Sequence, residues 1–90
     1  MTLMPLIAPL GDRGLLVRFA ETLDDAANIK AVGFSHALAA DPPVGVLEVV
    51  PKLVSVHLVY DPARTRFADL AGEVRLQLSL EGEPHVSRAE

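Results

Sequence analysis

The sequence contains no cysteine, and this absence excludes several kinds of site. Without thiols the chain has no disulfide framework, no thiolate nucleophile and no cysteine-ligated zinc ion. Such a composition fits a reducing compartment, and we expect a cytoplasmic protein.

Basic residues are also few, with eight Lys and Arg against twelve Asp and Glu and a net charge of −4. Proteins that bind nucleic acids or anionic membranes carry clusters of lysine and arginine, whereas here these residues are scattered. The apolar stretch 1–10 is interrupted by Pro5 and Pro9 and is far shorter than the ~20 residues of a membrane span. We therefore expect no nucleic acid and no membrane among the partners, and we predict an edge strand in this stretch.

Aromatic residues are scarce, since tryptophan is absent and the chain has only one Tyr and three Phe. Half of the residues are nevertheless hydrophobic, so the core must consist mainly of valine, leucine and alanine. A chain of 90 residues forms one domain and buries only roughly 60–65% of the surface that its unfolded form exposes. So high an apolar content in so small a domain indicates that some apolar surface faces another domain or subunit.

The segment 44–62 has the strongest pattern in the chain and predicts a β-hairpin. Its two arms, 46–50 and 54–60, are rich in β-branched residues and have the length of strands, and Pro51-Lys52 separates them. Alternate positions of the second arm are apolar, and these should face the core: Val54, Val56, Leu58 and Tyr60. Ser55 and His57 then point away from the core.

A second hairpin is predicted near the amino terminus, with strands at 6–10 and 14–19. Gly11 and Gly14 supply the conformational freedom that a tight connection requires. The core-facing residues of the second strand are Leu15, Val17 and Phe19. Leu16 then lies on the outer face as an exposed apolar residue.

The segment 23–40 has the spacing of apolar residues that predicts an amphipathic helix. It begins at Asp24 or Asp25, whose carboxylates can cap free amides and complement the helix dipole. The stripe expected against the sheet is Ala27, Ala31, Phe34 and Leu38. Ile29, Val32 and His36 recur on roughly the opposite face, and an equally good interpretation is that the helix ends are shifted and the helix is rotated.

A second helix is predicted at 66–80, with Thr65 as its cap. Its buried stripe should consist of Phe67, Leu70, Ala71, Val74 and Leu78.

Together these elements predict an α+β domain at residues 1–82. We expect a two-layer β-β-α-β-β-α sandwich in which a four-stranded antiparallel sheet carries both helices on one face. The core should contain Val17, Phe19, Phe34, Val56, Leu58, Phe67, Leu70 and Val74. Residues 83–90 turn polar and lose periodicity, which is typical of a linker.

No arrangement of residues predicts a catalytic, cofactor-binding or metal-binding site. The three histidines, His36, His57 and His85, lack the short spacing that brings two imidazoles together as metal ligands. We interpret His57 as a solvated or interface histidine and His36 as a surface residue. The turn at 11–14 resembles part of a glycine-rich phosphate loop, but it joins two strands and no helix follows it, so turn geometry explains its glycines better.

Asp24 and Asp25 also allow two interpretations. Paired carboxylates can perform acid/base chemistry. Adjacent side chains on a helix diverge, however, and capping needs no further assumption, so we interpret these residues as helix caps.

Several short motifs resemble one protein family in their order and spacing. They are the Gly-Asp-Arg turn within 10–19, Leu-Asp at 23–24, the segment 44–51 ending in Glu-Val-Val-Pro, Ser-Val at 55–56, and Tyr-Asp-Pro at 60–62. The chain resembles the amino-terminal domain of the KipI family, which includes a subunit of bacterial 5-oxoprolinase that was long described as allophanate hydrolase subunit 1. The resemblance implies the same β-β-α-β-β-α fold and makes 83–90 a linker toward a second, cyclophilin-like domain that is absent from this chain.

The resemblance also implies a function, which the residues alone do not. It implies a non-catalytic domain of a 5-oxoprolinase subunit or allophanate hydrolase subunit 1 protein, which scaffolds a hydrolase complex with a sister carboxyltransferase-like subunit. The whole protein would then be a subunit of an ATP-dependent amide hydrolase. An alternative is a KipI-like inhibitor that blocks a sensor histidine kinase by protein contact, and a third is a free-standing domain that binds a small molecule.

Some apolar residues have no predicted partner within the chain. They lie on the open sheet face and on the backs of the two helices: Leu16, Val59, Ile29, Val32, Leu76 and Leu80. Burying one such side chain contributes ~1.5–3 kcal/mol. We therefore predict that the isolated domain forms a two-fold homodimer, most simply through the open sheet face. The alternative is a monomer with scattered apolar surface residues.

Overall fold

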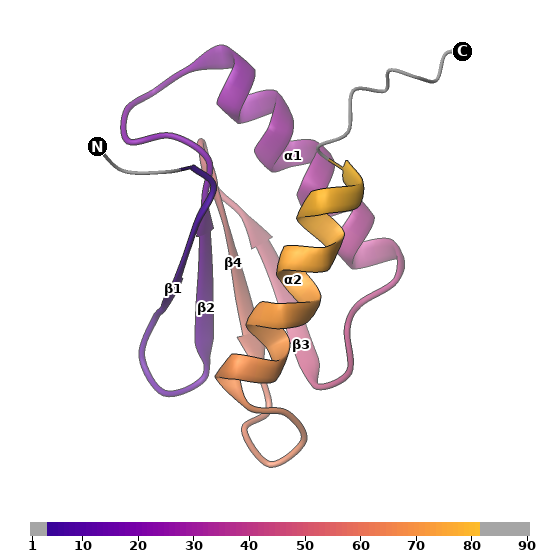
Figure 1. Ribbon diagram of the computed structural model, residues 1–90. Coiled ribbons are helices and arrows are strands. Elements are labelled where there is room, and N and C mark those ends of the chain that lie inside the picture. The colour runs from indigo at the N-terminus through magenta and orange to yellow at the C-terminus, as the bar shows by residue number, and fades with distance from the viewer. Residues whose placement is uncertain (1–3, 82–90) are drawn as a thin grey trace.

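The computed structural model describes residues 4–81, which form four strands and two helices (Figure 1). In chain order these are β1 (Leu6–Pro9), β2 (Gly14–Arg18), α1 (Asp25–Ala40), β3 (Val46–Pro51), β4 (Ser55–Tyr60) and α2 (Phe67–Glu81). The strands form one antiparallel sheet in the order β1-β2-β4-β3, and both helices lie on the same side of it. The predicted α+β fold is therefore confirmed. The predicted linker at 83–90 lies outside the described residues, as does His85.

The two central strands, β2 and β4, come from the two predicted hairpins and form the middle of the core. Leu15 pairs with Leu58 and Val17 with Val56, and all four side chains have 0% exposure. Pairs of large aliphatic side chains across neighbouring strands stabilise a sheet by direct contact. The alternating pattern in each strand therefore buries one face, as predicted.

The helices complete the core with the apolar stripes predicted for them. In α1 the buried apolar side chains are Ala27, Ala31, Phe34 and Leu38, and in α2 they are Leu70, Ala71 and Val74. Leu78, also predicted to be buried, is half-buried and packs against this cluster. Of the eight predicted core residues, six are buried, whereas Phe19 and Phe67 are half-buried and pack against the edge of the cluster. The Phe19 ring meets the Phe34 ring edge-on, with 5.8 Å between the ring centroids, a favoured aromatic geometry.

The start of α1 and the exposure of its side chains show which face of this helix packs against the sheet. The Asp24 carboxylate accepts a hydrogen bond from the Ala26 amide at 3.0 Å, so Asp24 is the N-cap and the helix begins at Asp25. Ile29, Val32 and His36 are exposed. The first interpretation of this helix is thus correct, and the rotated alternative is wrong.

The predicted cap of α2 is wrong. The helix begins at Phe67, and the Arg66 carbonyl accepts from the Leu70 amide, so Arg66 occupies the cap position. Thr65 belongs to the preceding turn, because its amide donates to the Asp61 carbonyl at 3.1 Å.

The connection between β3 and β4 lies slightly later than predicted. Pro51 is the last residue of β3, and the Lys52 amide donates to the Ser55 carbonyl at 2.8 Å to close the turn. Val54 therefore lies in this turn, where it is half-buried, and β4 begins at Ser55.

Candidate functional site

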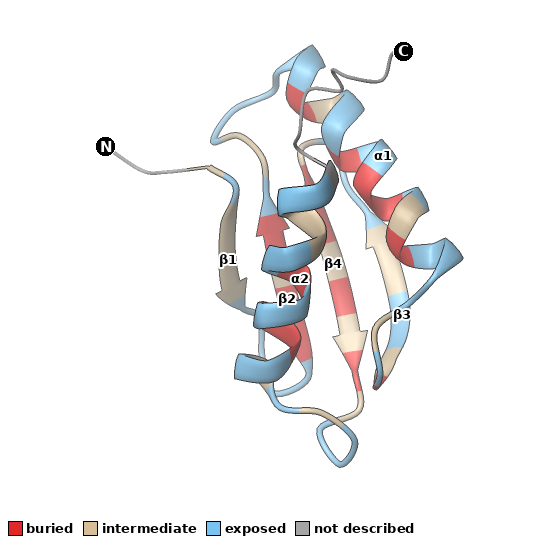
Figure 2. Cartoon of the chain, turned by 45° about the vertical axis from the view of Figure 1, so that its right-hand side comes forward, coloured by how far each residue is buried: buried red, intermediate tan, exposed pale blue. Residues whose placement is uncertain are grey.

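Within residues 4–81, no helix covers one of the two faces of the sheet. Because successive side chains of a strand point to opposite faces, the residues between the buried ones point away from α1 and α2. Figure 2 shows both helices on the buried side of the sheet. We call the other surface the open face, and its side chains are Leu6, Ala8, Leu16, Arg18, Leu47, Glu48, Val50, Ser55, His57 and Val59.

The strand register aligns one row of these side chains across the whole sheet. Ala8 pairs with Leu16, Leu16 pairs with His57, and His57 pairs with Val50. The outer face of a solvated antiparallel sheet is ordinarily polar. Here the central row consists of three aliphatic side chains and one histidine.

The charged side chains of the open face lie on either side of this central row. On one side, Arg18 of β2 lies between Leu6 and Ser55. On the other side, Val59 of β4 pairs with Glu48 of β3. Lys52, in the turn before β4, lies near His57 and beside Ser55, at the same end of the sheet as Arg18. The central row is therefore uncharged, with Arg18 and Lys52 on one side of it and Glu48 on the other.

The apolar residues of this face are less exposed than predicted. Leu16 and Val59 are half-buried, as are Ala8 and Val50, although neither of the two described helices covers them. Neighbouring side chains on a sheet shield each other because they lie only about 5 Å apart. The open face is therefore a continuous apolar patch and not a set of isolated exposed residues.

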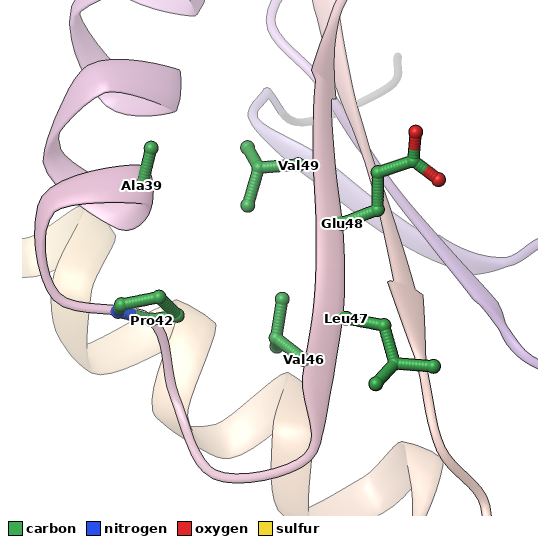
Figure 3. A pocket seen from close by; sticks show the side chains of 6 residues that line it. All are labelled: Ala39, Pro42, Val46, Leu47, Glu48 and Val49. Atoms are coloured by element: carbon green, nitrogen blue, oxygen red, sulfur yellow. The ribbon is translucent and has the colours of Figure 1, made fainter.

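A β-bulge in β3 decides which side chains reach the open face. The register shifts between Val46 and Glu48, which leaves Leu47 without a partner on β4. As a result Val46 and Val49 face α1, whereas Leu47 and Glu48 point to the other side of the strand (Figure 3). Without the extra residue, strict alternation would turn Glu48 toward the core. Leu47 is 60% exposed.

His57 lies at the centre of the open face, beside Leu16 and Val50. Burial lowers the pKa of its imidazole below the usual 6.5, and the nearby Lys52 ammonium lowers that pKa further. The neutral form is thus favoured at neutral pH, which suits a side chain that lies among aliphatic neighbours.

The other residues considered from sequence lie apart from the open face. His36 is exposed on α1, and within residues 4–81 no group of three His, Cys, Asp or Glu side chains could hold a metal ion. In the same part of the chain, neither helix has the length and hydropathy needed to cross a membrane.

The turn at 11–14 owes its glycines to geometry, as predicted. Gly11 has a φ of 71°, and a Cβ at Gly14 would clash with the Leu10 carbonyl oxygen. The Leu10 amide donates to the Gly14 carbonyl at 2.9 Å and closes the turn. It joins β1 to β2, so no helix amino terminus adjoins it to attract a phosphate.

Sequence reasoning missed the surface hollows found among residues 4–81, and two of them are lined by exposed apolar residues or by the end of α1. One, of about 200 Å³, lies between the end of α1 and β3, where Ala39 and Pro42 face Val46 and Val49 (Figure 3). The other lies at the end of the sheet and includes Leu23 and Leu53, which are 74% and 64% exposed. The second hollow is lined by residues 21–23 and 52–55, which are distant in sequence, so no local pattern brings them together.

Comparisons with known proteins found one matching family and several similar structures. The model of a family described as carboxyltransferase domain, subdomain C and D, matches residues 5–89. No curated protein matches the chain.

Three similar solved structures share this fold. A conserved uncharacterized protein from Pyrococcus horikoshii, PH0987, has a TM-score of 0.79 and 23% identity over 87% of this chain and 36% of its own. The N-terminal domain of the histidine kinase inhibitor KipI from Bacillus subtilis has a TM-score of 0.73 and 20% identity over 92% of each chain. TTHA0988 has a TM-score of 0.62 and 34% identity over 71% of this chain and 13% of its own. The present chain thus spans only about a third of the length of PH0987.

Proposed function

This chain belongs to the family of carboxyltransferase subdomains C and D, and on that premise we propose that it is a non-catalytic contact domain of a hydrolase assembly. The assembly is of the 5-oxoprolinase or allophanate hydrolase type, acts in the cytoplasm, and includes a sister carboxyltransferase-like subunit. In this proposal the domain holds protein chains together, and the chemistry takes place elsewhere.

The observation that carries the proposal is the apolar open face. Its central row presents aliphatic side chains around a largely neutral histidine, at positions where a solvated sheet would present polar ones. Continuous apolar patches rimmed by polar residues are characteristic of protein interaction sites. Arg18 and Glu48 provide such a rim.

The test is to mix the chain with a sister carboxyltransferase-like subunit and to measure the mass of the assembly by light scattering. Leu16→Glu places a charge in the central row and should reduce the mass, because it removes one contact surface. Leu76→Glu is the matched control, since Leu76 is 59% exposed on the back of α2, and it should leave the mass unchanged. An assembly of unaltered mass with Leu16→Glu would contradict the proposal.

A second function is inhibition of a sensor histidine kinase by protein contact. It is favoured by the fold match to the N-terminal domain of the histidine kinase inhibitor KipI, which covers 92% of both chains. The corresponding experiment adds the chain to a sensor histidine kinase and follows autophosphorylation. Inhibition that disappears with Leu16→Glu and persists with Leu76→Glu would favour this function over the hydrolase assembly.

A further inference from the structure

We propose that the open face binds the open face of a second copy of this chain, in a two-fold arrangement that pairs Arg18 of each copy with Glu48 of the other. The inference rests on the proposed contact function, and it assigns the open face to the contact between two copies of this chain.

Neither edge strand of the sheet is suited to pair with a second copy of the chain, which leaves the face of the sheet for association. At one edge, β1 has only four residues and ends in Pro9, which has no amide hydrogen to donate. At the other edge, β3 has a bulge at Leu47 and ends in Pro51. Short strands, prolines and bulges are the devices that prevent one sheet from extending another. The open face is therefore the part of the sheet left for a second copy.

The charges of the open face complement those of an identical face. Its central row is uncharged, and charges of opposite sign lie on the two sides of that row: Arg18 and Lys52 on one side and Glu48 on the other. In a two-fold dimer every contact between two different residues occurs twice, so one attractive pair between Arg18 and Glu48 is formed at two places. Pairing of opposite charges then fixes the orientation of the two copies.

The strand register places His57 midway between these two charges. Arg18 pairs with Ser55, two residues before His57, and Glu48 pairs with Val59, two residues after it. β4 also lies between the strands that carry Arg18 and Glu48. The two charged residues are thus roughly 10 Å apart across the strands and roughly 14 Å apart along them, by standard sheet spacings.

Consider two open faces that lie against each other, with a two-fold axis in the plane between them. If this axis passes over His57 and is perpendicular to the line from Arg18 to Glu48, it places Arg18 of each copy opposite Glu48 of the other. Both pairs of opposite charges then form at once. The strands of the two sheets then cross at a steep angle, close to the orthogonal class of sheet packing.

In this arrangement the two His57 side chains lie next to each other on the axis. Two neutral imidazoles can pack there, whereas two imidazolium groups would repel each other. The charged groups around His57 are Arg18 on β2, Glu48 on β3 and Lys52 in the turn before β4, while the open-face residues of β1 are uncharged. A low pKa of His57 is therefore favourable for the contact at neutral pH.

The open face belongs to a sheet of only four strands, each of four to six residues. Small interfaces are typical of weak, transient contacts. We therefore expect a dissociation constant in the micromolar range and not in the nanomolar range.

The test is a charge exchange followed by analytical ultracentrifugation of the chain over the micromolar range. Arg18→Glu and Glu48→Arg each place like charges at both contacts and should weaken association by about tenfold or more, because two attractive pairs become repulsive. The double variant restores opposite charges and should associate like the unmodified chain. An equimolar mixture of the two single variants should also associate, because Glu at position 18 of one copy then meets Arg at position 48 of the other.

Lys30→Glu is the control, because Lys30 is exposed on α1, away from the open face. It should not alter association, and circular dichroism should show that all variants are folded. A monomer for the unmodified chain throughout the range would overturn the inference, as would a mixture of the single variants that stays monomeric. If the chain is a monomer while Leu16→Glu still reduces the mass of the hydrolase assembly, the inference fails and the proposed contact function stands.

Discussion

The neighbouring residues Leu15 and Leu16 give the sharpest test of which sheet face is buried. Leu15 has 0% exposure and lies between Pro9 and Leu58, whereas Leu16 lies on the open face. Leu15→Ala removes three carbon atoms from the core, at about 0.8 kcal/mol for each buried methylene. The cavity that remains adds to this loss, and we expect the free energy of unfolding to fall by about 3–4 kcal/mol.

The same substitution at Leu16 should have a much smaller effect. Its side chain is already partly in solvent and leaves no enclosed cavity, so we expect a loss of about 1 kcal/mol or less. Urea denaturation followed by circular dichroism measures both values, at a protein concentration low enough to keep the chain monomeric. For a domain of this size a loss of about 3 kcal/mol also lowers the Tm by roughly 12–24 °C. Equal losses of unfolding free energy at the two positions, or a larger loss at Leu16, would refute the strand register that places Leu15 in the core and Leu16 on the open face.

Four further outcomes are expected. Asp24→Ala should lower the stability by about 1 kcal/mol in urea denaturation, because the Ala26 amide loses its cap, and Asp25→Ala should cost less. Gly14→Ala should reduce the Tm, since its Cβ would meet the Leu10 carbonyl, and an unchanged Tm would contradict the turn geometry. Because the pKa of His57 is lowered on folding, its contribution to stability is present above about pH 6.5 and is lost as the pH falls through the lowered pKa. His57→Gln should therefore weaken the pH dependence of the free energy of unfolding, measured by urea denaturation at several pH values. Finally, 5-oxoproline, allophanate and nucleotides should leave the Tm of the chain unchanged, and a reproducible shift would favour a small-molecule-binding domain.

The elements of the fold follow from local sequence patterns. Alternation in 14–19 and 54–60 identified the buried side of both central strands, and helical spacing identified the stripes of α1 and α2. These patterns are readable because the side-chain periods of strands and helices differ. The motifs around Gly11 and Pro51 also indicated the right family, which the match to residues 5–89 confirms.

The errors occurred where contacts from outside a segment decide its structure. Thr65 has the composition of a helix cap, yet its amide is held by Asp61 in the preceding turn, and α2 begins two residues later. Phe19 and Phe67 fit the core pattern, but they lie at its margin and are only half-buried. Periodicity predicts the direction in which a side chain points and not how many neighbours surround it.

The sequence by itself determined the order of the strands and helices and the buried faces of the central strands and of α1, because each of these depends on residues close together in the chain. It left the cap of α1 open between Asp24 and Asp25, and the hydrogen bond from the Ala26 amide identified Asp24. Only the tertiary structure decided that β2 pairs with β4, and this pairing aligns Ala8, Leu16, His57 and Val50 in one row. The bulge at Leu47, which turns Glu48 onto the open face, was likewise decided by pairing with β4. The register between strands is set by contacts across the sheet, and for this reason no pattern within a single strand could have predicted that Arg18 and Glu48 flank His57.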